Sequence, residues 1–83
     1  MSKRNKYALL TNHLKNDNRL EIELTFNQIE KILGFALPSS SRKYKANWSN
    51  GLSRAMSRSW IEAGYHTNEV DLAKEVVIFA KGD

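Results

Sequence analysis

Seven consecutive residues in the middle of the chain bring together hydroxyl groups, cations and one aromatic ring. They are Ser39, Ser40, Ser41, Arg42, Lys43, Tyr44 and Lys45. Serine hydroxyls and main-chain N–H groups at the start of a helix bind phosphate oxygens, and cations add an attraction that weakens steeply with salt. This combination therefore predicts contacts with the phosphate backbone of a nucleic acid. The alternative is a polar loop in which one serine caps a helix.

A second polar group follows, and its residue types suit the recognition of bases. It consists of Asn47, Asn50, Arg54 and Arg58. Asparagine pairs with adenine, and arginine pairs with guanine, in the major groove of DNA. Arg54 and Arg58 are four residues apart, so they share one face of a helix. Asn50 has an alternative role as the N-cap of that helix, and this is the role that we expect for it.

Two tryptophans lie within the same region, and each can serve either a ligand or the core. Indole rings stack on bases or close a ligand pocket, whereas in a small domain they more often belong to the core. We expect Trp60 in the core because it lies beside the apolar stripe of a predicted helix. For Trp48 both roles stay open, and we include it among the candidate nucleic-acid-binding residues.

Basic and acidic residues are separated along the chain. From Lys31 to Ile61 there is no acidic residue, whereas the acids lie on either side of this span. The cations of the span are Lys31, Arg42, Lys43, Lys45, Arg54 and Arg58, and a second basic group consists of Lys3, Arg4 and Lys6. With a net charge of +4, this separation predicts a one-sided positive field and a polyanionic partner, first of all double-stranded DNA. The alternative is a solvated basic face without a partner.

The residues that metal sites and active sites require are missing or scattered. Cysteine is absent, and His13 and His66 are the only histidines, so we expect no metal site. The acids lie on strand faces and helix ends at scattered spacing, and no glycine-rich phosphate loop occurs, so we expect neither an enzyme nor a cofactor. No apolar run reaches the length of a membrane span, which predicts a cytoplasmic protein without membrane contact.

The hydrophobic pattern predicts the elements that would hold these residues. Tyr7, Leu10 and Leu14 recur at helical spacing within residues 6–15. Residues 19–24 alternate between polar and apolar, which predicts a strand with Leu20, Ile22 and Leu24 on its buried face. We expect residues 1–5 to form a disordered basic arm and residues 6–83 to form a single domain.

Local signals predict the helices that follow this strand. Thr25 and Gln28 form a capping box at the start of a helix that ends at Gly34. Pro38 suits the start of a short helix. A longer helix is expected from Ser49 or Asn50 through Ala63, with a buried stripe that contains Leu52, Ala55, Met56 and Ser59.

The chain ends in a predicted hairpin with strands at residues 65–72 and 76–80. The second strand is apolar on both faces, so we expect it in the middle of a sheet. The order helix, strand, helix, short helix, longer helix, strand, strand predicts an α+β domain of winged helix-turn-helix type. In this interpretation the hairpin is the wing, and the first strand completes a three-stranded antiparallel sheet. Another arrangement of the same α+β elements is the alternative.

Several short motifs together resemble a small, poorly characterised bacterial and phage domain family. The resemblance spans about residues 7 to 80 and includes Leu24-Thr25-Phe26, Ile29-Glu30, Leu33-Gly34, Leu37-Pro38, Trp48-Ser49-Asn50, Trp60 and Ala63-Gly64-Tyr65. Members of that family occur alone and beside restriction or nuclease-type domains, which implies a role linked to DNA. The chain departs from the family pattern at Ser41, Asn47 and Tyr65, where alanine, tryptophan and tryptophan are usual.

Two function hypotheses follow from these observations. The first is a small DNA-binding regulator from a phage or bacterium, which uses residues 39–58 and the arm at Lys3, Arg4 and Lys6. The second is an inhibitor or adaptor that binds a host protein, or a pocket for an anionic small molecule such as a nucleotide. A third hypothesis is that the protein is a dimeric structural component and that its basic face is ordinary solvated surface.

Overall fold

Helix α1 (Ala8–Lys15) is the first helix of the chain in the described residues. The computed structural model describes residues 6–82, so the predicted arm, residues 1–5, lies outside the described residues. Leu10 and Leu14 are fully buried, and Tyr7, immediately before the helix, is nearly so. The predicted helix and its apolar face are therefore confirmed.

Strand β1 (Glu21–Thr25) follows an exposed turn. Ile22 and Leu24 are buried and face the core, as the alternation predicts. The expectation for Leu20 is wrong, because this side chain is 77% exposed. Leu20 precedes the first paired residue of the strand and lies outside the hydrophobic core cluster.

Helix α2 (Phe26–Leu33) has the predicted local signals at both ends. The hydroxyl of Thr25 accepts a 3.0 Å bond from the backbone N–H of Gln28, and the Gln28 side chain accepts a 2.8 Å bond from the Thr25 N–H. Gly34 then adopts a left-handed conformation with φ of 85°, which glycine tolerates at little cost. The capping box and the glycine C-cap are both confirmed.

Three helical segments connect this helix to the terminal hairpin. The first is α3 (Ser39–Lys43), which begins directly after Pro38, and the second is the 3₁₀ helix η1 (Lys45–Trp48). The third is α4 (Ala55–Glu62), which is joined to α1 by a 2.8 Å hydrogen bond from the Thr11 hydroxyl to the Ser59 carbonyl oxygen.

Helix α4 begins later than predicted, at Ala55 rather than at Ser49 or Asn50. Arg54, directly before it, has an extended backbone with φ of −110° and ψ of 140°. The Asn50 side chain does not cap the helix but bonds to the backbone N–H and the carbonyl oxygen of Thr67 on a neighbouring strand. These bonds hold the preceding loop against the sheet, so the helix cannot extend back through it.

The late start also changes which apolar residues of this region are buried. Leu52, which was expected on the buried stripe, lies in the loop and is 65% exposed, so this prediction is wrong. Met56, Ser59 and Trp60 are buried, as the helical spacing predicts.

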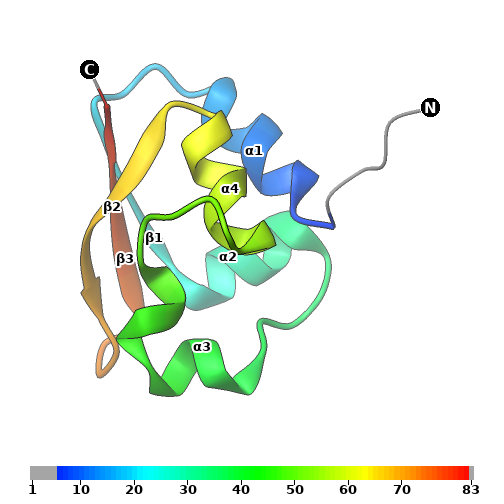
Figure 1. Cartoon of the computed structure of the whole chain (residues 1–83), viewed down its shortest axis with the longest axis vertical. Coiled ribbons are helices and arrows are strands. Elements are labelled where there is room, and N and C mark those ends of the chain that lie inside the picture. Colours follow the sequence, from blue (N-terminus) through cyan, green and yellow to red (C-terminus); the bar gives the residue numbers. More distant parts are fainter. Residues whose placement is uncertain (1–5, 83) are drawn as a thin grey trace.

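The sheet is antiparallel, with strands in the order β1-β3-β2. Strand β3 (Val76–Lys81) lies between β1 and β2 (Tyr65–Asp71), which confirms the expectation of a central terminal strand. The sheet forms one layer, and the helices lie against one side of it (Figure 1). Residues 6–82 therefore form a mixed α+β fold with four α-helices and a three-stranded antiparallel sheet, as expected at this level.

Four aromatic rings run through the core from α2 to the sheet. Phe26 and Trp48 are stacked with ring centroids 4.9 Å apart, and Trp48 stacks on Trp60 at 5.9 Å. Trp60 meets Phe79 of β3 at 5.5 Å with the rings tilted. We call these four residues the aromatic stack. It joins α2, η1, α4 and β3, so it ties the helical layer to the sheet.

The aromatic stack provides a direct test of the fold. Trp48→Phe keeps a ring in place but removes the indole N–H, which donates a 2.8 Å bond to the buried Ser41 carbonyl oxygen. We expect the free energy of unfolding to fall by about 1–3 kcal/mol, because that carbonyl loses its partner and a gap forms. Urea denaturation followed by far-UV circular dichroism measures the loss. Tyr44→Phe, at an exposed position, should stay within about 0.5 kcal/mol of wild type, and an equally small effect of Trp48→Phe would contradict the packing.

Candidate anion-binding site

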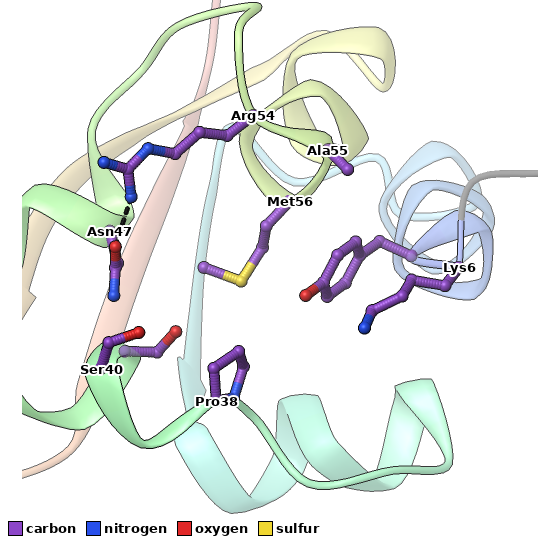
Figure 2. Close-up of a pocket in the computed structure, with 9 residues that line it drawn as sticks. Lys6, Pro38, Ser40, Asn47, Arg54, Ala55 and Met56 are labelled. Atoms are coloured by element: carbon purple, nitrogen blue, oxygen red, sulfur yellow. Dashed lines mark hydrogen bonds between the residues drawn. The ribbon is translucent and has the colours of Figure 1, made fainter.

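A pocket of about 400 Å³ lies where the residues before α1 meet α3, η1 and the start of α4 (Figure 2). Its volume falls within the range of sites for small ligands. The lining residues are Lys6, Tyr7, Pro38, Ser40, Ser41, Asn47, Arg54, Ala55 and Met56. The pocket thus combines apolar walls with hydroxyl, amide and cationic groups.

The apolar walls come from side chains that also belong to the core. Tyr7 and Met56 are mostly buried, and each presents only part of its surface to the pocket. Figure 2 shows the Met56 side chain in the middle of the pocket, with Asn47 and Ser40 on one side and Lys6 on the other. Since core packing fixes Met56, this wall is formed before any ligand binds.

Two cations lie on different sides of the pocket. Arg54 donates a hydrogen bond from its Nη1 atom to the Asn47 side-chain oxygen. On the side of Lys6, the ammonium lies 5.5 Å from the Tyr7 ring centroid and 5.3 Å from that of Phe35. Within residues 6–82, no aspartate or glutamate lines the pocket. The pocket is therefore positively charged and favours an anion.

The sequence predicts that Arg42 contacts phosphate, but in the structure its side chain pairs with two carboxylates. Its guanidinium pairs with Glu30 at 2.9 Å and with Glu75 at 2.7 Å, and it lies 5.7 Å from the Phe26 ring centroid. These carboxylates raise the pKa of Arg42, Glu75 first. These two carboxylates already balance its charge within the fold, so Arg42 is less available to a phosphate than an unpaired cation is. It instead links α3 to α2 and to the turn between β2 and β3.

Three further residues of the predicted interface have structural roles. Trp48 is 1% exposed in the aromatic stack, and Ser41 is buried beneath it. Asn50 accepts a 2.9 Å bond from the Trp60 indole N–H as well as the bond from Thr67, so its side-chain oxygen is fully used. Trp48 and Asn50 thus serve the scaffold, because Trp48 is buried in the core and Asn50 is the partner of the Trp60 indole. Ser41 accepts the Trp48 indole N–H at its backbone carbonyl and also lines the pocket.

The remaining predicted residues outside the pocket lie on the surface. They are Ser39, Lys43, Tyr44, Lys45 and Arg58. In the described part of the chain, Lys43, Lys45 and Arg58 have no carboxylate oxygen within 4.0 Å. Their charges are therefore available to a partner.

Acidic residues gather on the outer face of the sheet, away from the helices. Glu23 and Glu69 both pair with Ile78 of β3, so they flank it on the same face. Glu21 and Asp71 occupy the corresponding outward positions of their strands. The separation of charge along the sequence is thus kept in space, with this acidic face on the side of the sheet that the helices leave open.

The sequence gives no local signal for the pocket as a unit. Ser40, Asn47 and Arg54 are among the predicted binding residues, and Lys6 belongs to the predicted basic arm. Tyr7 and Met56 have helical spacing that indicates only a core role. The pocket exists because the start of α1 meets the start of α4, which are far apart in the chain.

The sequence of residues 7–82 matches a family described as Domain of unknown function (DUF7662). The chain belongs to this family. The match covers nearly the whole described part of the chain, so the family corresponds to the complete α+β unit. No curated protein and no solved structure matches the chain.

Over residues 6–82, no cluster of three or more histidine, cysteine, aspartate or glutamate side chains is arranged to hold a metal ion. None of the helices in that range has the length and apolar character needed to cross a membrane.

The ion pairs of Arg42 lead to a pH-dependent stability. The Leu37 N–H, which donates a 2.8 Å bond to Glu30, and then Arg42 lower the pKa of the Glu30 carboxyl. A carboxyl whose pKa is lowered by folding stabilises the fold when the pH is above the pKa of the unfolded state, which is about 4.3 for glutamate. This stabilisation is lost as the pH falls through the pKa of the folded state. We therefore expect Arg42→Met to destabilise the protein at neutral pH and much less in acid, where the carboxylates are protonated.

Urea denaturation of wild type and Arg42→Met at about pH 7 and about pH 2.5 tests this expectation. Lys43→Met is the matched control, because it removes a neighbouring cation that has no carboxylate partner in the described residues. Its midpoint should stay close to wild type at both pH values. An Arg42→Met effect of the same size in acid and at neutral pH would contradict a role through the ion pairs.

Proposed function

We propose that this protein is a small DNA-binding module that contacts the phosphate backbone through the exposed cations of α3, η1 and α4. The observation that carries this proposal is that Lys43, Lys45 and Arg58 are exposed and, within the described residues, unpaired with carboxylates. Cations in this state bind phosphates and release the counterions that surround DNA.

The order of the elements supports a winged-helix arrangement. The strand order β1-β3-β2, with the helices inserted between β1 and β2, agrees with a terminal hairpin that serves as the wing. In this arrangement α4 is the helix that faces DNA, and Arg58 lies on its exposed side. Glu75 lies in the turn of the hairpin, and its ion pair with Arg42 holds that turn against α3.

The acidic outer face of the sheet supports one direction of approach. Glu21, Glu23, Glu69 and Asp71 repel phosphates, so duplex DNA is directed toward the helical side. The resemblance to a family whose members occur beside restriction or nuclease-type domains supports DNA as the polyanion. A regulatory role in a bacterium or phage is the corresponding biological proposal.

The salt dependence of duplex binding tests this function. Three phosphate contacts correspond to a slope of log K against log salt of about −2.7, since each contributes about −0.9. We expect Lys43→Gln/Lys45→Gln to weaken binding and to reduce the slope to about −0.9. Fluorescence anisotropy with a duplex that carries 5′-hydroxyl ends, at several salt concentrations, measures both quantities.

The matched control is Lys15→Gln/Lys81→Gln, which removes the same charge from positions outside the acid-free span. It should leave the slope near that of the wild type. Absence of binding at low salt, or binding that is indifferent to salt, would refute the proposed function. Equal effects of the two double variants would indicate attraction to net charge rather than an interface at α3 and η1.

A further inference from the structure

We infer that the pocket binds the phosphomonoester of a nucleotide, either free or at the end of a DNA strand. This site is separate from the proposed duplex contacts, because Lys43, Lys45 and Arg58 do not line it. The ligand of the pocket therefore has a defined size and charge, unlike a stretch of DNA backbone. Three features of the pocket favour this ligand: its charge, its hydrogen-bond donors and its apolar walls.

The charge of the pocket favours a dianion over a singly charged group. Lys6 and Arg54 line different sides of the pocket, and no carboxylate within residues 6–82 lines it. A phosphomonoester carries a charge of about −1.5 to −2 near neutral pH, whereas a carboxylate or an internal phosphodiester carries about −1. Two cations without a carboxylate in the lining thus give the pocket a positive potential that favours a terminal phosphate over a backbone phosphate.

The donors at one side of the pocket suit phosphate oxygens. Arg54 uses one N–H to hold the Asn47 side-chain oxygen, and its guanidinium has five N–H donors in all. This bond orients the guanidinium before any ligand arrives, which lowers the entropy cost of binding. Ser40 adds a hydroxyl on the same side of the pocket (Figure 2).

The apolar walls suit the rest of a nucleotide. Tyr7, Pro38 and Met56 form these walls, and core packing fixes the two buried side chains, Tyr7 and Met56. Flat rings bind to such surfaces by burying apolar area. The pocket volume of about 400 Å³ accommodates a ligand of mononucleotide size. This volume is larger than an inorganic ion needs.

Isothermal titration calorimetry with adenosine 5′-monophosphate tests the inference, with adenosine and inorganic phosphate as comparison ligands. We expect saturable binding of the monophosphate at least about tenfold tighter than binding of either comparison ligand. Arg54→Gln should weaken it about tenfold or more, because it removes a charge-assisted contact. Arg58→Gln, one helical turn further along α4 and outside the pocket, should leave the affinity within about twofold.

A second variant separates binding from local folding. Asn47→Asp keeps an oxygen that accepts the Arg54 hydrogen bond but adds a negative charge to the lining. We expect it to retain the wild-type melting temperature and to lose nucleotide binding. Binding of adenosine as tight as that of the monophosphate, or equal losses in Arg54→Gln and Arg58→Gln, would overturn the inference. So would unchanged binding by Asn47→Asp.

Two oligonucleotides of the same sequence distinguish the source of the ligand. Competition with the monophosphate by a 5′-phosphorylated strand, but not by its 5′-hydroxyl counterpart, assigns the pocket to DNA ends. Competition by neither strand assigns it to free nucleotides. Because the duplex assay uses 5′-hydroxyl ends and Lys43 and Lys45, it can fail while nucleotide binding holds, and the reverse also applies.

Discussion

The contact between Trp48 and Trp60 is the interaction on which the rest of the structure depends. The two indoles stack within the core, and Phe26 and Phe79 extend the column to α2 and to the sheet. Each indole N–H donates inside the protein, to the Ser41 carbonyl oxygen and to the Asn50 side chain. A domain of this size has a small margin of stability, so one continuous aromatic column with satisfied polar atoms accounts for how short helices such as α3 and η1 stay folded.

This column also determines which polar groups remain for a ligand. It fixes Trp48 at the end of η1, which places the adjacent Asn47 beside Arg54 in the pocket. At the other end of the column, Arg42 covers the Phe26 ring and pairs with carboxylates from two other elements. One cation of the acid-free span therefore stabilises the fold, one lines a pocket, and those on the outer surface of α3, η1 and α4 face solvent.

Much of the scaffold could be predicted because its causes are local. The face of α1, the capping box at Thr25, the left-handed Gly34 and the apolar β3 each depend on residues a few positions apart. The errors have a different origin. The start of α4 and the exposure of Leu52 depend on the bonds between Asn50 and Thr67, which belong to segments that the sequence does not show to be neighbours. The helical spacing predicts that the helix starts at Ser49 or Asn50, but the tertiary contact between Asn50 and Thr67 outweighs this local preference.

The sequence by itself determined the separation of charge, the α+β class and the helix and strand signals, because composition and short-range spacing set these properties. Only the tertiary structure decided which cations are free, since that depends on where carboxylates lie in space. Arg42 and Lys43 are adjacent in sequence and alike in charge, yet only Arg42 meets Glu30 and Glu75. The pocket is tertiary for the same reason: Lys6 and Arg54 come from opposite halves of the chain and line one cavity only after α1 packs beside α4.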